Sequence, residues 1–174
     1  MYRTLKVVAL SSLLAAAVFA TGCATTAKTE NASPMTEKIS KFNKIDVRVK
    51  TGIDEAKQSL NTIETQVASN LEPRFKTVRL VEGEKEEGTL VLNLEVVDYK
   101  RHSNVGRFFL GSLMGPDIVT VKATLINLAT NQPIGTFTGT GEANLGGIVV
   151  GDTGIYRAST ELGKEINKFL AAQN

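Results

Sequence analysis

Few side chains in this sequence could carry out catalysis. His102 is the only histidine, and it lies near Asp98 and Ser103, residue types that hydrolases use as orienting acid and nucleophile. No serine lies within a Gly-x-Ser-x-Gly motif, however. One histidine and one cysteine would leave a metal site to be built from carboxylates. We therefore expect no enzyme activity, no metal and no cofactor, and we predict that His102 lies in a loop and faces solvent.

Two glycine-rich links match nucleotide-binding motifs only in part. Residues 146–153 have the spacing of a phosphate-binding loop, but Asp152 stands where the motif requires lysine. A carboxylate at that place would repel the phosphate. Gly139 and Gly141 begin a dinucleotide fingerprint, yet Asn144 occupies the third glycine position. Neither ATP nor NAD is therefore expected to bind.

The strongest chemical signal is Cys23, the only cysteine of the chain. It follows an apolar run, residues 7–20, and a basic start that contains Arg3 and Lys6. A run of about fourteen residues suits the hydrophobic region of a signal peptide and is shorter than the ~20 residues of a membrane-spanning helix. The order predicts that residues 1–22 are a signal peptide. The last three residues before the cysteine are small: Ala20, Thr21 and Gly22.

This arrangement resembles the lipobox of bacterial lipoprotein precursors. There the cysteine thiol receives a diacylglyceryl group, the chain is cut before the cysteine, and the new amine is acylated, as with palmitate. Thr21 and Gly22 fit the pattern, whereas Ala20 replaces the usual leucine. Ala24 rather than aspartate follows Cys23, which by resemblance to Gram-negative lipoproteins implies anchoring to the periplasmic face of the outer membrane. The alternatives are ordinary cleavage after Ala20, which leaves a free thiol, and an uncleaved anchor, for which the run is too short.

The charge of the mature chain is balanced. The sequence has 20 basic and 18 acidic side chains, and removal of the signal peptide takes away Arg3 and Lys6. Eighteen of each sign remain, so net charge gives no reason to expect a nucleic-acid partner. With Cys23 acylated, no thiol is left for a disulfide, and stability must come from an apolar core. A mature chain of about 150 residues is long enough to bury one.

The mature chain is expected to divide into a tether and one domain. Residues 23–41, the lipidated cysteine and the segment after it, are rich in Ala, Thr, Lys, Glu and Ser, contain Pro34, and show no sustained apolar period. We interpret them as a flexible tether that would hold the domain about 20–25 Å from the lipid. Residues 42–174 are expected to form a single α+β globular domain.

Apolar periodicity predicts the elements of this domain. Residues 42–50 alternate between apolar and charged side chains, which indicates a half-buried strand. From Ile53 to Leu71 apolar residues recur at steps of three and four, which indicates a helix that starts at Asp54. The order β-α-β-β-β-β-α favours an antiparallel sheet of about five strands with two helices packed on one face. The other strands are expected at 77–81, 89–100, 118–127 and 134–142, with a charged hairpin loop at 82–88 and a second helix at 153–170.

Four motifs follow one another along the domain: a long strand, an arginine followed by a glycine-containing connection, a strand of alternating valines, and a turn rich in Asn, Ala and Thr. They occupy residues 96–100, Arg107, Gly111, Gly115, 119–125, 127–131 and 139–142. This set resembles the bacterial lipoprotein family called domain of unknown function 4410, over residues 44–170. Asn131 replaces the usual turn glycine. The resemblance implies the same class and location, and it brings no established activity.

The connection after the long strand is the best candidate for a binding surface. Residues 100–115 begin with basic side chains and continue with apolar side chains and glycines. An exposed apolar loop implies a protein partner or a membrane surface. Residues 148–150 would extend this patch if they lie nearby. The alternative is that the apolar part folds into the core, since single exposed apolar residues mean little. The residues predicted to form the surface are Arg107, Phe108, Phe109, Leu113, Met114, Ile148 and Val149.

Together these features favour a non-catalytic binding or scaffold module of the cell envelope, with an unidentified envelope protein or ligand as its partner. The alternative is a carrier of a small ligand or lipid, with a pocket between sheet and helices. An envelope hydrolase is the weakest hypothesis, because the sequence offers no credible set of acid, base and nucleophile.

Overall fold

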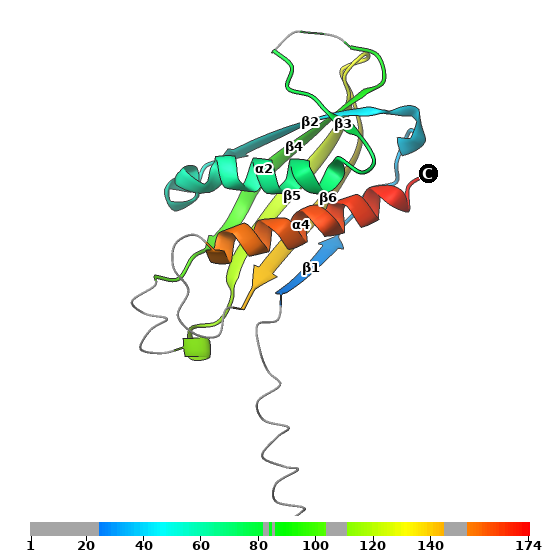
Figure 1. Cartoon of the computed structure of the whole chain (residues 1–174). Helices are drawn as coiled ribbons and strands as arrows, with labels where there is room; N and C mark the ends of the chain where they lie inside the picture. Colours follow the sequence, from blue (N-terminus) through cyan, green and yellow to red (C-terminus); the bar gives the residue numbers. More distant parts are fainter. Residues whose placement is uncertain (1–24, 82–83, 85, 104–110, 145–152) are drawn as a thin grey trace, which may run out of the picture.

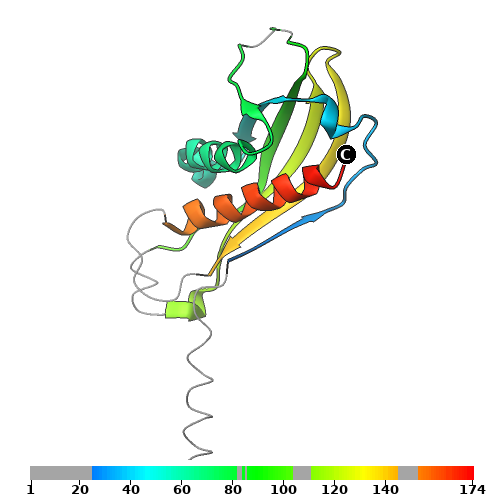
Figure 2. The same ribbon diagram turned by 45° about the vertical axis from the view of Figure 1, so that its right-hand side comes forward.

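The computed structural model describes residues 25–81, 84, 86–103, 111–144 and 153–174. Two helices cover one face of a curled six-stranded sheet with the strand order β1-β6-β5-β4-β2-β3 (Figure 1, Figure 2). The expected α+β class is thus confirmed. The strands are β1 (Thr25–Glu30), β2 (Lys44–Thr51), β3 (Lys76–Thr77), β4 (Thr89–Lys100), β5 (Asp117–Asn127) and β6 (Gln132–Ala143). The helices are α2 (Leu60–Leu71) and α4 (Thr153–Ala171), and the short 3-10 helices are η2 (Ile39–Lys41), η3 (Asp54–Ser59) and η4 (Gly111–Met114).

The sheet is mixed, and the expectation of an antiparallel sheet is wrong in this detail. β4, β5 and β6 form an antiparallel meander, but β2 lies parallel to β4, with Lys44 opposite Thr89 and Thr51 opposite Val96. Parallel neighbours cannot be joined by a tight turn, so the chain between them must cross the sheet. α2 lies in that crossover and packs on the sheet. The sheet also has one more strand than expected, because β1 joins its edge.

Residues 77–81 do not form the hairpin strand expected before β4. β3 contains only Lys76 and Thr77 and lies parallel to β2. Beyond it, the Val78 N–H donates one more hydrogen bond to the Ile45 carbonyl, at 2.9 Å. The charged segment that follows therefore connects the edge of the sheet to β4, and it does not close a hairpin.

The segment expected to be a flexible tether starts with a strand. β1 pairs antiparallel with β6 over six positions, from Thr25 opposite Ala143 to Glu30 opposite Thr138. Its side chains alternate between half-buried and exposed. The expectation of a tether failed because this pairing uses backbone hydrogen bonds and small or polar side chains, so no apolar period marks it.

The chain also stays attached to the sheet between β1 and β2. The N–H groups of Ser33 and Thr36 donate to the carbonyls of Thr136 and Ile134, each at 2.9 Å. Ile39 of η2 is 1% exposed and belongs to the core. The described fold therefore begins at β1, and not at residue 42 as expected.

The core lies between the helices and one face of the sheet. Alternate residues of β2, β4 and β5 and the apolar stripes of both helices are buried there. β6 contributes glycines: a Cβ on Gly141 would overlap the carbonyl oxygen of Ala158, and a Cβ on Gly139 would lie 2.8 Å from Leu162 Cδ1. α4 therefore packs closely on β6 and runs antiparallel to it. The core's largest fully buried side chains include Ile45, Ile63, Leu71, Leu90, Leu92, Leu94, Leu125, Leu162 and Ile166.

Candidate functional site

The structure describes part of the predicted binding surface. Leu113 and Met114 lie in η4, where the Leu113 side chain is 87% exposed and Met114 is half-buried. η4 is therefore the described part of that surface. The remaining predicted residues, together with the predicted lipid-attachment site and the residues before it, lie outside the described residues: Arg107, Phe108, Phe109, Ile148, Val149, Cys23, Ala20, Thr21 and Gly22.

Four strands have an end in one row beside η4. Thr25 of β1 lies opposite Ala143 of β6, which lies opposite Asp117 of β5. The next position of β5, Ile118, pairs with Lys100 at the end of β4. α4 also starts at this end, and η4 lies just before β5 (Figure 1, Figure 2). We call this end of the sheet the proximal end. It comprises the first residues of β1 and β5, the last residues of β4 and β6, η4, and the start of α4.

The chain reaches the proximal end from Cys23. Thr25 is the second residue after Cys23, and an extended chain covers at most about 3.6 Å per residue. The Cα atoms of Cys23 and Thr25 therefore lie within about 7 Å of each other. A group attached to Cys23 would therefore be close to this end of the sheet, and not at the distance of about 20–25 Å that a coil would give.

His102 and Asp117 form a buried pair that links the end of β4 to the start of β5. The His102 N–H donates to Asp117 Oδ1 at 2.8 Å, and His102 Nδ1 lies 3.1 Å from the same oxygen. The two side chains are 9% and 4% exposed, so the prediction that His102 faces solvent is wrong. The pair joins the residues on either side of the connection, residues 103–116, and fixes both of its ends at the proximal end.

This pair differs from the catalytic set considered from the sequence. Asp98, the expected orienting acid, is exposed, and a bulge after Val96 shifts the register of β4 just before it. The acid that meets His102 is Asp117, on the next strand. Since the carboxylate also accepts a backbone N–H, it holds a loop end as well as an imidazole ring. No local spacing in the sequence could have indicated this contact.

Two side chains that the sequence analysis did not single out are exposed at the proximal end. Tyr156, in the first turn of α4, is 49% exposed, and Arg157 beside it is exposed too. Lys100 and Arg101 leave β4 at the same end and are also exposed. The signal for Tyr156 is weak in the sequence, because it lies beside the buried Ile155 at the border of the apolar stripe.

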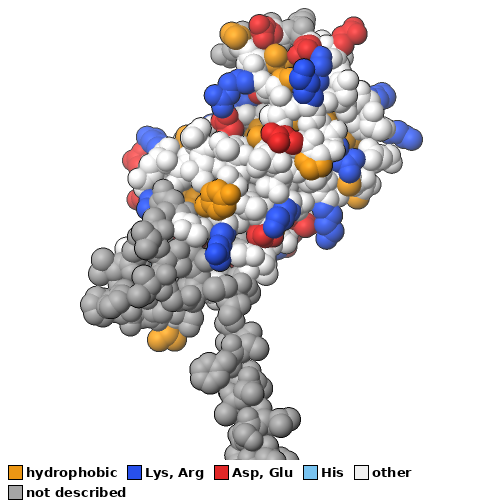
Figure 3. Space-filling model, viewed as in Figure 1, with side chains coloured by type: hydrophobic (Ala, Val, Ile, Leu, Met, Phe, Trp, Pro, Cys, Tyr) orange, Lys and Arg blue, Asp and Glu red, His pale blue; other side chains and the backbone are white. Residues whose placement is uncertain are grey.

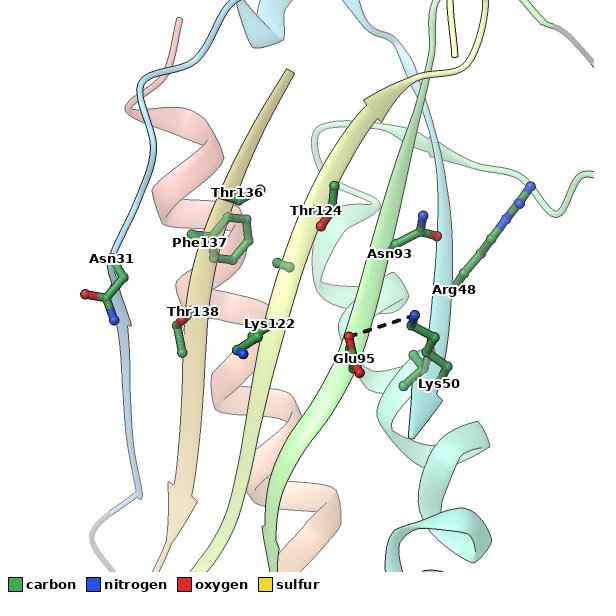
Figure 4. Close-up of a pocket in the computed structure, with 12 residues that line it drawn as sticks. Asn31, Arg48, Lys50, Asn93, Glu95, Lys122, Thr124, Thr136, Phe137 and Thr138 are labelled. Carbon is green, nitrogen blue, oxygen red and sulfur yellow. Dashed lines mark ion pairs between the residues drawn. The ribbon is translucent and has the colours of Figure 1, made fainter. Parts of the chain in front are cut away.

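A polar hollow lies on the sheet face away from the helices (Figure 4). It has a volume of about 630 Å³, and its lining includes Lys50 of β2, Glu95 of β4 and Lys122 of β5. Lys50 Nζ lies 3.8 Å from a Glu95 carboxylate oxygen, and Arg48 at its border is paired with Asp46 at 2.7 Å. Its lining also includes Val49, Ala123 and Phe137, so polar and apolar side chains both face the hollow. The apolar core fills the middle of the space between sheet and helices, where the carrier hypothesis placed a pocket. At its edge, two open hollows of about 300 and 640 Å³ lie between α2 and β2, with Val47 and Glu64 in the lining of both.

Charged side chains of both signs are interspersed over the helix-covered face, which therefore has no large patch of one sign (Figure 3). Within the described ranges, no three His, Cys, Asp or Glu side chains gather in a way that could hold a metal ion. In the same part of the chain, neither helix combines the length and the apolar character needed to cross a membrane.

No protein family model matches the sequence, and no curated protein is similar to it. Membership of the domain of unknown function 4410 family is therefore not shown. Among solved structures, a PelC dodecamer from Paraburkholderia phytofirmans resembles the fold with a TM-score of 0.51 at 16% identity, over 83% of this chain and 95% of that one.

Two other solved structures resemble the fold less well. A Xanthomonas campestris protein of family DUF330 gives a TM-score of 0.49 at 10% identity, over 76% of this chain and 85% of that one. A lipoprotein from Neisseria meningitidis gives 0.36 at 11% identity, over 75% of this chain and 95% of that one. At such identities the likeness to PelC shows a shared fold alone.

Proposed function

We propose that this chain is a lipid-anchored, non-catalytic lipoprotein of the bacterial envelope, which binds or scaffolds envelope components at the periplasmic face of the outer membrane. The position of β1 is the observation that carries the proposal. β1 begins two residues after Cys23, the residue that ends the signal-peptide pattern, and pairs into the sheet from Thr25 onward. A lipid on Cys23 would therefore lie directly beside the proximal end.

Acyl chains on Cys23 would hold the domain close to the membrane. Each buried methylene contributes about 0.8 kcal/mol to membrane binding, so two or three chains anchor a protein almost permanently. Because β1 is paired with β6, the domain stays near the membrane surface. The partners within its reach are components at or in the membrane. Copies of this chain are one such class, since the PelC structure with a similar fold is a dodecamer.

The way the reactive side chains are used supports a non-catalytic role. Acylation would consume the Cys23 thiol. His102 is held by Asp117 through both its ring and its backbone, which is a structural use of the pair.

Replacing Cys23 with serine tests the anchor. The wild-type protein should partition into detergent and have the mass of a chain that starts at Cys23 and carries acyl groups. The Cys23→Ser variant should show neither the added mass nor cleavage before position 23. Ala24→Ser is the matched control, because it adds the same side chain one position later and should behave as wild type. Identical mass and partitioning of wild type and Cys23→Ser would refute the proposal.

The hollow on the open sheet face favours a second candidate function, the carrying of a small polar ligand. Lys122 is exposed on the central strand β5, whereas Lys28 is exposed on the edge strand β1 and does not line the hollow. A ligand seen by native mass spectrometry of protein from native membranes, and lost in Lys122→Ala but not in Lys28→Ala, would support this function. A native mass explained by chain and lipid alone would contradict it.

A further inference from the structure

We propose that the proximal end itself contacts the lipid bilayer, with Leu113 of η4 and Tyr156 of α4 at the level of the lipid headgroups. This inference rests on the proposed lipid at Cys23 and adds a contact made by the folded domain. The bilayer is the occupant of this surface because the anchor and the two side chains lie at the same end of the sheet.

The register of the sheet sets the distance between the anchor and η4. Thr25, Ala143 and Asp117 lie side by side on three neighbouring strands, and neighbouring strands are about 4.8 Å apart. Thr25 and Asp117 are therefore about 10 Å apart. Leu113 precedes Asp117 by only four residues, as Cys23 precedes Thr25 by two. A bilayer that holds the acyl chains of Cys23 is within reach of η4.

Exposed large apolar side chains are few in the described part of the chain. They are Leu113, Val81, Tyr156 and Val97, with exposed fractions of 87%, 70%, 49% and 38%. Leu113 and Tyr156 lie at the proximal end, whereas Val81 lies in the connection before β4 at the opposite end (Figure 1). An exposed leucine together with a tyrosine suits a membrane interface, because the tyrosine ring is apolar and its hydroxyl stays in contact with water.

Basic side chains accompany the two apolar ones. Lys100, Arg101 and Arg157 are exposed at the same end. Long basic side chains lay their methylene stems on apolar surface while their charged heads reach lipid phosphates. Asp98 and Glu142 lie on the sheet face away from α4, and Lys100, which pairs with Ile118 opposite Glu142, lies on that same face. Asp117 is buried beside His102. Arg157, the residue after Tyr156 in α4, is therefore the basic side chain best placed to meet a phosphate headgroup beside the tyrosine.

Tyr156 belongs to a packed element of the fold, and Leu113 lies four residues before the buried Asp117. The hydrogen bonds of His102 to Asp117 fix the ends of the connection that contains η4. Tyr156 lies two residues before Ala158, whose backbone packs against Gly141 of β6. Because α4 is held on the sheet and Leu113 is close in sequence to β5, contact of both side chains with a bilayer would orient the domain.

Tryptophan reporters can test the contact, because the chain has no tryptophan of its own. Leu113→Trp and Tyr156→Trp place the reporter at the proximal end, and Val81→Trp places it at an exposed position of the opposite end. Each full-length lipidated variant is reconstituted into vesicles of phosphatidylethanolamine and phosphatidylglycerol. A second set of vesicles also contains brominated phosphatidylcholine, which quenches tryptophan fluorescence inside the bilayer.

We expect the emission of both proximal reporters to shift to shorter wavelength in vesicles and to be quenched several-fold more strongly than that of the reporter at position 81. Equal quenching at the three positions would overturn the contact. Intact mass measured on the same samples tests the anchor separately. Lipidated protein with equal quenching removes the contact and leaves the proposed function standing, whereas protein without acyl mass contradicts the proposed function itself.

Discussion

The two ends of the domain are held together differently. At the proximal end four strands have an end in one row, and His102 and Asp117 form a buried pair. The distal end, where β2 and β4 begin, also has strand ends in one row, with Lys44 opposite Lys76 and Thr89, and buried apolar residues such as Leu90. Its polar contacts, however, include partly exposed ion pairs such as that of Lys44 with Glu86. Ion pairs of this kind contribute about 0–1 kcal/mol each. Register and apolar burial therefore support both ends, and the ends differ in whether their polar pair is buried or exposed to water.

Gly141→Ala should produce the largest loss of stability and tests the packing of the proximal end. A Cβ at Gly141 would overlap the carbonyl oxygen of Ala158 and lie 3.0 Å from Leu162 Cβ, so α4 would have to move away from β6. We expect the free energy of unfolding, measured with urea, to fall by about 3 kcal/mol. Gly52→Ala is the control, because a Cβ there has nothing within 4 Å. Equal effects of both changes would break the comparison.

Asp117→Ala should have the next largest effect. It leaves the buried N–H of His102 without its acceptor, which costs about 2 kcal/mol of unfolding free energy. The control is Asp98→Ala, because Asp98 is exposed and surface substitutions usually change stability by less than about 0.5 kcal/mol. Chemical denaturation of both variants measures the difference. A negligible loss in Asp117→Ala would show that the buried pair does not stabilise the proximal end.

At the distal end, Lys44→Gln should cost only about 0.5 kcal/mol of unfolding free energy. Lys44 and Glu86 keep 26% and 37% of their side chains exposed, so water and salt weaken their attraction. The loss should shrink further when denaturation is repeated at high ionic strength. A loss as large as that of Asp117→Ala, and insensitive to salt, would mean that ion pairs hold this end as firmly as burial holds the other.

The smallest expected effect is the pH dependence that Glu37 introduces near the distal end. The Asn127 amide donates to the Glu37 carboxylate at 3.0 Å, and this bond, with Lys41 nearby, lowers the pKa of Glu37 below its ordinary 4.5. Such a group stabilises the fold above that ordinary value, and its contribution is lost as the pH falls through the folded pKa. Glu37→Gln should therefore slightly flatten the decline of the urea midpoint in acid. An unchanged slope would contradict this assignment.

Apolar periodicity predicted most core elements with nearly correct bounds. β4 begins and ends at the expected residues, and α4 extends the expected helix by one residue. These elements are visible in the sequence because each buries one face, and burial imposes a period of two or 3.6 residues. The first helix is the partial exception. Its expected first turns, from Asp54 to Ser59, form the 3-10 helix η3, and the α-helix starts at Leu60.

The sequence did not reveal contacts that depend on the backbone or on distant partners. Half-buried positions of β1 hold Thr25, Ala27 and Thr29, which are small or polar, so the strand has the composition of a linker. The parallel pairing of β2 with β4 has no local signature either, because it follows from the crossover. In the candidate site, the sequence indicated the region of Leu113, but not Tyr156, which only the packing of α4 brings to the same end.

β1 also determines how traction would pass from the membrane into the domain. With acyl chains on Cys23, as proposed, a pull along the axis of β1 would enter the sheet at Thr25. Since β1 runs antiparallel to β6 over six positions, such a pull shears the ladder, and its hydrogen bonds resist together instead of opening one after another. The backbone bonds of Ser33 and Thr36 continue the attachment past the strand. A segment with the composition of a flexible linker would thus transmit force through a paired strand.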